Sequence, residues 1–358
     1  MREFRLLFTG DLGDAAGNPA GDLALDLLEA APHVRTGFLT DQRTDADDPA
    51  CQDLLYSREV LPRHVAAANG IVVCRPWVKA SAFADGAATL VAIGRAGIGY
   101  DKIDLAACTA HDVVVFNAPH GLTHSTASAA MLFILALSKR LPLQEKLVRE
   151  HRWDLQAGAI GRDLAGQTLG IVGLGRTGQE LVRLIAPYRM RVIAYSPHAS
   201  PEQARTLDVT LVDTLEQVLR ESDYVSLHCR LDEGTRLLIG ERELGLMKPT
   251  ACIVNVARGE MVDEDALFRF LRDRRIAGAG LDVFQSEPLP PSSPLLSLDN
   301  VILTPHWLAS TCEAGRATME SVMEGMVRVS RGQLPSHVLN PEVLRRPGFR
   351  EKLARFRG

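Results

Sequence analysis

Short apolar runs alternate with amphipathic helical patterns along most of the chain. In the first 120 residues the apolar runs predict strands at Arg5–Thr9, Gly70–Cys74, Thr89–Ile93 and Val113–Asn117, with a helix over Leu23–Ala30. Alternation of strands with helices is typical of parallel α/β folds. This part of the chain therefore predicts a parallel sheet.

A second α/β block begins near Leu164. Its regular spacing predicts a doubly wound sheet. The predicted strands are Thr168–Val172, Arg191–Tyr195, Tyr224–His228, Cys252–Asn255, Gly280–Val283 and Val301–Leu303, and the helices are Thr177–Pro187, Thr214–Glu221, Glu241–Met247 and Glu264–Arg274. Two longer helices flank this block. Ser125–Ser138 is apolar on most of its circumference, which indicates burial, and Cys312–Arg331 follows the last strand.

Length and composition narrow the class of protein. The 358 residues suggest two domains, and 46% hydrophobic residues exclude disorder as the main state. A net charge of −4 gives no overall field toward nucleic acid or an anionic membrane. The longest apolar stretch is too short to span a bilayer, the N-terminus has no signal-peptide pattern, and the six cysteines are scattered. We therefore expect a cytoplasmic protein that binds neither nucleic acid nor a membrane and holds no metal.

A glycine motif marks a candidate nucleotide site. Gly173, Gly175 and Gly178 fit the pattern G-x-G-x-x-G between a predicted strand and a predicted helix. Such a turn brings backbone N–H groups and the positive end of a helix to a pyrophosphate. The next strand ends in Ser196-Pro197-His198, without the carboxylate that binds the ribose of NAD and without a directly following arginine. The choice between NAD and NADP stays open.

Three later segments complete a larger pattern: Ile253–Glu264, Gly280–Leu289 and Leu303–Ala309. With the glycine motif and the loop Gly94–Asp101, they resemble the D-isomer-specific 2-hydroxyacid dehydrogenase family in order and spacing, from about Val72 to Thr311. The resemblance implies two Rossmann-like domains. A doubly wound NAD(P)-binding domain, residues 119–310, is inserted in a flavodoxin-like substrate domain of residues 1–118 and 311–358. It also implies a cleft between the domains and a homodimer in which the helix Ser125–Ser138 takes part.

The resemblance also assigns roles to residues. His306 is the expected acid/base, Glu287 the carboxylate that favours its protonated form, and Arg258 the group that binds and polarises the substrate. Gly97 and Ile98 are expected to hold the substrate carboxylate through backbone N–H groups. The expected cofactor contacts are Thr126, Gly173, Gly175, Arg176, Thr177, Gly178, Ser196, Pro197, Cys229, Val256, Ala257, Arg258, Asp282 and His306.

The sequence departs from the family at three places. Ser196 replaces the usual acidic residue, Arg230 replaces a proline near the adenine or ribose, and Thr126-Ala127-Ser128 replaces a Val-Ala-Glu triplet. The first two keep NADP open beside NAD. The expected reaction is hydride transfer between NAD(P)H and a small 2-keto acid such as glyoxylate or hydroxypyruvate. The alternative is an NAD(H)-sensing binding protein of the corepressor type.

Overall fold

The computed structural model describes residues 2–14, 18–42 and 56–357. The chain forms two compact units, the first of Met1–Leu122 with Ser310–Gly358 and the second of Thr123–Ala309. The second unit is therefore inserted in the first, and the chain passes between them twice. The chain leaves the first unit after Leu122 and returns to it after Ala309.

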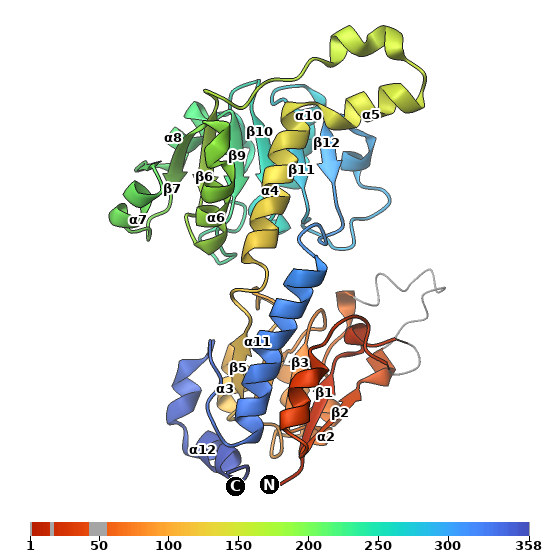
Figure 1. Cartoon of the computed structure of the whole chain (residues 1–358), viewed down its shortest axis with the longest axis vertical. Helices are drawn as coiled ribbons and strands as arrows, with labels where there is room; N and C mark the ends of the chain where they lie inside the picture. Colours follow the sequence, from red (N-terminus) through yellow and green to blue (C-terminus); the bar gives the residue numbers. More distant parts are fainter. Residues whose placement is uncertain (1, 15–17, 43–55, 358) are drawn as a thin grey trace. The chain divides into compact units, whose positions relative to one another are not determined.

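The first unit is built on a five-stranded parallel sheet in the order β2-β1-β3-β4-β5 (Figure 1). The strands are β1 Phe4–Phe8, β2 Val34–Phe38, β3 Gly70–Val73, β4 Ala92–Arg95 and β5 Val114–Asn117. This order is that of the flavodoxin-like fold. The sequence prediction missed β2, and its strand Thr89–Ile93 begins three residues and ends two residues before β4. The predicted helix at Leu23–Ala30 is a 3-10 helix over Leu25–Ala30.

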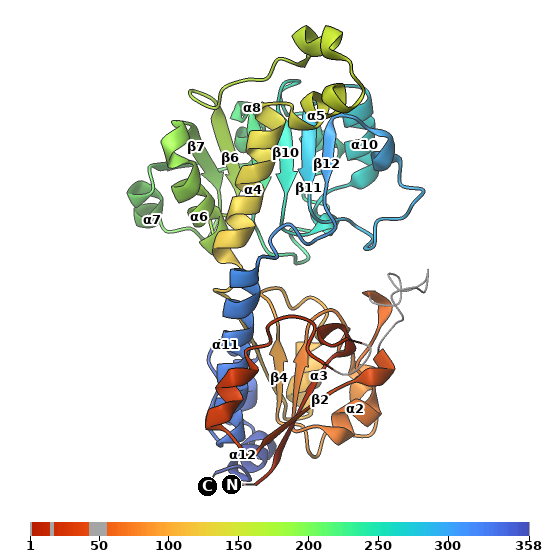
Figure 2. The same ribbon diagram turned by 45° about the vertical axis from the view of Figure 1, so that its right-hand side comes forward.

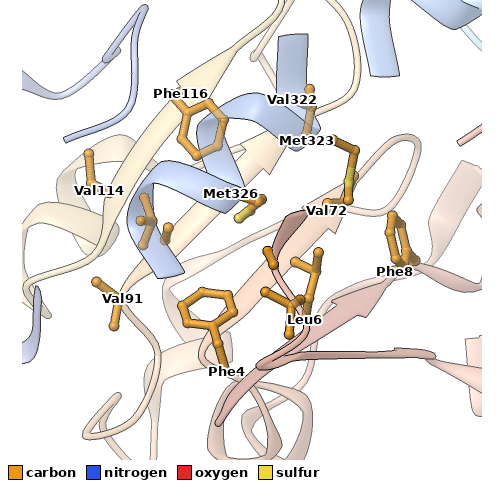
Figure 3. Packing of buried hydrophobic residues seen from close by; sticks show 14 of the residues in the cluster. Phe4, Leu6, Phe8, Val72, Val91, Val114, Phe116, Val322, Met323 and Met326 are labelled. Carbon is orange, nitrogen blue, oxygen red and sulfur yellow. The ribbon is translucent and has the colours of Figure 1, made fainter. Parts of the chain in front are cut away.

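Helix α11 completes the core of this unit. It spans Cys312–Ser330 and packs on the sheet, while α2 Pro62–Ala67, α3 Leu105–Ala110 and α12 Pro347–Ala354 are shorter. Figure 3 shows Met326 and Val322 of α11 among Phe4 and Phe116 of the strands. All four side chains are fully buried or nearly so. The segment that follows the inserted unit thus supplies one side of the first unit's hydrophobic core.

The second unit holds a seven-stranded parallel sheet in the order β12-β11-β10-β9-β6-β7-β8 (Figure 2). Its strands are β6 Thr168–Val172, β7 Arg191–Tyr195, β8 Val209–Leu211, β9 Tyr224–Leu227, β10 Cys252–Asn255, β11 Gly278–Leu281 and β12 Val301–Leu303. Strand order reverses between β6 and β9, as in a Rossmann fold, which confirms the predicted fold class. The edge strand β8 was not predicted, and β11 begins and ends two residues earlier than predicted.

The helices of the second unit are α4 Thr123–Ser138, α5 Leu141–Arg149, α6 Arg176–Ile185, α7 Pro201–Thr206, α8 Leu215–Glu221, α9 Glu241–Leu244 and α10 Glu264–Arg272. As expected, α4 buries residues on several sides, including Ala127, Phe133 and Ile134. Within the described ranges no single helix has the length and apolar character to cross a membrane. The bent pair α4 and α5, which meet at 61°, passes that test jointly by length and composition.

Two glycines of α11 test its packing. A Cβ atom on Gly325 would lie 2.3 Å from the ring of Phe116, whereas a Cβ on Gly315 meets nothing within 4 Å. We expect Gly325→Ala to lower the free energy of unfolding by about 1–3 kcal/mol through overpacking. The matched change Gly315→Ala is expected to raise it by roughly 0.5–1 kcal/mol through helix propensity. Urea unfolding followed by circular dichroism measures both, and equal effects would contradict the packing described.

Candidate active site

The turn between β6 and α6 has three glycines, two of which a larger residue could not replace without a steric cost. Gly173 has a φ of +95°, and a Cβ on it would lie 2.7 Å from the backbone nitrogen of Cys229. A Cβ on Gly178 would lie 2.6 Å from the carbonyl oxygen of Gly173, so the helix approaches the strand closely. A Cβ on Gly175 would meet no atom within 4 Å. Its backbone therefore borders open space at the start of α6.

The start of α6 and the end of β7 lie next to each other. Helix α6 begins at Arg176, and no side chain caps its N-terminus. The carbonyl of Tyr195 accepts a hydrogen bond from the N–H of Gly173 at 2.9 Å. Ser196, the next residue along the chain, therefore begins its loop beside the glycine turn. Pro197 and His198 are exposed. The free helix end suits a pyrophosphate, and no residue of the loop 196–198 is a carboxylate that would repel a ribose phosphate.

His306 and Glu287 form a hydrogen-bonded pair. Nδ1 of His306 lies 2.8 Å from Oε2 and 3.0 Å from Oε1 of Glu287. The backbone N–H of Phe284 also donates to Glu287, at 3.2 Å. Burial raises the pKa of the Glu287 carboxyl, but the hydrogen bond and charge of His306, with a smaller contribution from Arg258, outweigh it and bring the pKa below its ordinary value. Glu287 therefore stays ionised beside the imidazole.

Asp282 holds the loop that carries His306. The Asp282 side chain is buried, and its Oδ1 accepts hydrogen bonds from Oγ1 of Thr304 at 2.5 Å and from the N–H groups of Trp307 and Leu308 at 3.1 and 3.2 Å. His306 itself has a φ of +52°, a left-handed conformation that is unusual for a residue with a Cβ. These three bonds hold the loop around this conformation. Burial raises the pKa of Asp282.

Asn255 holds the turn that carries Arg258. It is the last residue of β10 and is buried. Its Oδ1 accepts from the N–H of Ala257 at 3.0 Å, and its Nδ2 donates to the carbonyl of Arg258 at 2.8 Å. The guanidinium of Arg258 donates to the carbonyl of Ala257 at 2.7 Å. Since β10, β11 and β12 are adjacent, Arg258, Asp282, Glu287 and His306 all follow neighbouring strands at one edge of the sheet.

In the first unit, the loop after β4 has its carbonyl groups bonded to the protein. Arg95 donates from Nε to the carbonyl of Gly99 at 2.7 Å and from Nη1 to that of Ala96. The carbonyl of Gly97 accepts from the N–H of Ala118 at 3.2 Å, and that of Ile98 accepts from Nδ2 of Asn117 at 2.7 Å. Four consecutive carbonyls are thereby turned toward the protein. The N–H groups of Ala96 and Gly97 also bond within the protein, to the carbonyls of Val73 and Arg95 at 2.8 and 2.9 Å.

The model of the D-isomer-specific 2-hydroxyacid dehydrogenase NAD-binding domain matches residues 131–307. A glyoxylate reductase of Korarchaeum cryptofilum is 40% identical over 262 residues, which cover 72% of this chain and 79% of that enzyme. A D-3-phosphoglycerate dehydrogenase of Methanocaldococcus jannaschii is 41% identical over 251 residues, 70% of this chain but 48% of that enzyme. The crystal structure of the TT0316 protein from Thermus thermophilus superposes with a TM-score of 0.77 at 30% identity, over 94% of this chain and 99% of that one.

The chain belongs to the D-isomer-specific 2-hydroxyacid dehydrogenase family. It is an NAD(P)-dependent enzyme of that family, and its own residues fit the cofactor. The open space at Gly175 and the uncapped start of α6 leave room and free N–H groups for the pyrophosphate. The absent carboxylate after β7 keeps both NAD and NADP possible.

The structure brings many of the predicted cofactor residues of the dehydrogenase to one edge of the second sheet. Cys229 lies against Gly173, and Val256 and Ala257 directly follow β10. Thr177 lies in the first turn of α6, whereas Thr126 lies in α4. Gly97 and Ile98 belong to the first unit. Contact of each residue with cofactor or substrate stays a prediction.

Sequence reasoning missed the residues that support these groups: Arg95, Asn117, Asn255 and Thr304. It also assigned Asp282 to the cofactor alone, whereas the structure shows it bonded to the His306 loop. A signal for such residues exists in the sequence. Arg95, Asn117 and Asn255 are polar residues that close an otherwise apolar strand. Such a polar residue must find a partner in the loop that follows.

Two glycine substitutions test the cofactor turn. Gly175→Val is expected to weaken NADH and NADPH binding by roughly tenfold or more, because its side chain fills the space beside the helix start. Gly178→Val is expected to lower the unfolding midpoint as well, since its Cβ would lie 2.6 Å from the Gly173 carbonyl. Isothermal titration calorimetry and thermal unfolding measure the two effects. Unchanged cofactor affinity in Gly175→Val would place the pyrophosphate elsewhere.

Proposed function

We propose that this dehydrogenase acts as a reductase of small 2-keto acids, with glyoxylate or hydroxypyruvate as substrate and a D-2-hydroxy acid as product. The observation that carries the proposal is the 2.8 Å contact between His306 and Glu287, beside Arg258, at one edge of the second sheet. The similar Korarchaeum cryptofilum enzyme named a glyoxylate reductase supports the substrate. The names of the relatives do not favour the alternative, an NAD(H) sensor.

His306 supplies the proton in this proposal. Glu287 is hydrogen-bonded to Nδ1 of the imidazole, so Nε2 is the nitrogen that would exchange a proton with the substrate. The cofactor, when bound, supplies the hydride. Protonated His306 donates to the keto oxygen as it gains negative charge, and neutral His306 accepts the proton in the reverse direction. Glu287 stabilises the imidazolium and keeps it oriented.

Arg258 and the loop after β4 bind the substrate in this proposal. The guanidinium offers several donors to the keto and carboxylate oxygens and stabilises the developing charge. Gly97 and Ile98 lie in the loop whose carbonyls are bonded to Arg95, Asn117 and Ala118. In this proposal the N–H groups of Gly97 and Ile98 receive the substrate carboxylate, that of Gly97 in place of its bond to the Arg95 carbonyl. Asn255 and Asp282 act as positioning residues for the two catalytic loops.

We also propose a homodimer formed through an arm of the second unit, residues 139–162. The arm contains α5 and the 3-10 helix Trp153–Ala159, and it lies beyond the end of the sheet (Figures 1 and 2). The described ranges contain ten exposed large hydrophobic residues. Five of them lie in this arm and a sixth lies in the adjoining α4: Leu141, Val148, Trp153, Leu155, Ile160 and Leu132. A second copy would bury them. The cytoplasmic location stays a prediction.

The catalytic pair gives a test by substitution. We expect His306→Asn to lower kcat for glyoxylate or hydroxypyruvate by about 10²–10⁴ without weakening NAD(P)H binding, because the proton donor is lost. Loss of NAD(P)H absorbance at 340 nm measures the rate. The wild type oxidising neither NADH nor NADPH with these acids would overturn the proposed function, and full turnover by His306→Asn would overturn the role of His306.

Glu287→Gln serves as the companion variant. It removes the negative charge that stabilises the imidazolium while keeping the side-chain size. Reduction needs the protonated imidazole, so its rate is expected to begin falling at a lower pH than in the wild type. An unchanged pH profile would show that Glu287 does not influence the proton donor.

The arm gives a test of assembly. We expect the double variant Trp153→Glu, Ile160→Glu to be monomeric, because two charges would be buried without partners in the dimer. Leu334→Glu, an equally drastic change at an exposed position of the first unit, is expected to stay dimeric. Light scattering after size-exclusion chromatography gives the masses. A monomeric wild type, or a dimeric double variant, would contradict the proposal.

A further inference from the structure

The loop that carries Glu287 is held by the segment that carries Arg258. This segment, residues 258–264, runs from Arg258, the N-cap of a short 3-10 helix, to Glu264, the first residue of α10. The loop 284–287 follows β11 and ends in Glu287. Contacts between these two stretches of chain therefore fix the position of Glu287 relative to Arg258.

The first contact joins two backbones. A Cβ atom on Gly259 would lie 1.9 Å from the carbonyl carbon of Phe284 and 2.1 Å from its carbonyl oxygen. This approach is open only to a glycine, because a Cβ does not come within 3.0 Å of a backbone atom unless that atom moves. Phe284 is buried, and its N–H donates to Oε1 of Glu287 at 3.2 Å. The residue next to Arg258 thus rests against the backbone that bonds Glu287.

The second contact is made by Gln285, two residues before Glu287. Its backbone N–H donates to Oε1 of Glu264, and its Nε2 donates to the carbonyl of Val262 at 2.6 Å. Both acceptors belong to the segment 258–264. Glu264 is the acceptor that lies on a side chain, so a substitution can remove it.

The start of α10 does not use the carboxylate of Glu264 as its cap. Asp263 is the N-cap, and its Oδ1 accepts from the N–H of Ala266 at 3.0 Å. Glu264 instead turns its carboxylate to the backbone of Gln285 in the neighbouring loop. Its side chain therefore serves a contact between two loops rather than its own helix.

Glu264 makes this contact in the presence of like charges. Its side chain is partly buried, and this burial raises the pKa of the Glu264 carboxyl. The hydrogen bond from Gln285 lowers that pKa, and the charges of three nearby carboxylates raise it again: Asp265, Glu287 and Glu260. A carboxylate in such a place is stabilised by a specific donor. The N–H of Gln285 is that donor.

From these contacts we infer that Glu264 is a positioning residue for the reaction, because it fixes the loop that presents Glu287 to the imidazole of His306. The inference rests on the proposed function, in which Glu287 stabilises and orients protonated His306. The charged groups around Glu287 are His306, Arg258 and Glu264. A shift of about 1 Å in a catalytic pair can cost roughly 10²-fold in rate. Loss of the Glu264 contact is therefore expected to change proton transfer.

The test measures kcat against pH, with glyoxylate or hydroxypyruvate, in the wild type and three variants of the whole chain. Glu264→Ala removes the acceptor for the Gln285 N–H. It is expected to lower kcat by about 10–100-fold and to move the fall in rate to a lower pH, because the imidazolium loses its oriented partner. Glu264→Gln keeps an acceptor oxygen and is expected to restore most of the rate and the wild-type pH profile. The control, Asp265→Ala, removes the exposed carboxylate next along α10 and is expected to behave as the wild type.

The outcomes separate the inference from the proposed function. If the wild type reduces neither acid, the proposed function fails and this inference fails with it. If the wild type is active and Glu264→Ala equals it, or lowers kcat with an unchanged pH profile, only the role of Glu264 is overturned. A pH shift in Glu264→Gln as large as that in Glu264→Ala would assign the effect to charge and overturn a role through the loop. Should Glu264→Ala fail to fold, Gln285→Ala, which removes the bond to Val262, is expected to show both effects in the same direction.

Discussion

The site depends on the hydrogen bonds that one buried carboxylate oxygen of Asp282 accepts. They hold a loop in which His306 has a left-handed backbone and reaches Glu287. Without them the loop would lose the partners of two N–H groups, and the imidazole would lose its fixed position. The same principle recurs at β10, where buried Asn255 bonds both ends of the turn that carries Arg258. A polar residue at or just beyond the end of a buried strand thus fixes the reactive group that follows it.

The first unit uses this device for a different purpose. Arg95 and Asn117 close β4 and β5 and take three carbonyl groups of the loop 96–99. The group proposed to bind substrate here is the backbone of the loop 96–99. Bonds to its carbonyl oxygens determine which of its polar atoms remain for a ligand. Both units therefore place rigid, pre-bonded loops at the carboxyl edge of a parallel sheet. Such preorganisation avoids the cost of ordering these groups during the reaction.

The sequence predicts the buried centre of this fold well and its margins poorly. β6, β10 and the glycine turn are apolar or conformationally restricted, so their patterns are distinct. β2 and β8 are edge strands with exposed residues, and each lacks the continuous apolar run that marks a buried parallel strand. The pair of His306 and Glu287 was foreseen through family resemblance, whereas Asn255 and Thr304 were not. Their role depends on which loop folds back over them, and a linear pattern does not contain that contact.

The order of the two units along the chain constrains how the protein folds as it is synthesised. The first sheet is encoded before the inserted unit, but α11, which covers it, is encoded after that unit. Phe4 and Phe116 thus leave the ribosome well before Met326 and Val322, with which they share a core. At synthesis rates of about 5–20 residues per second, this apolar sheet face waits roughly 10–40 seconds for its cover. The inserted unit can complete its own core during that interval. The second unit can therefore fold before the first.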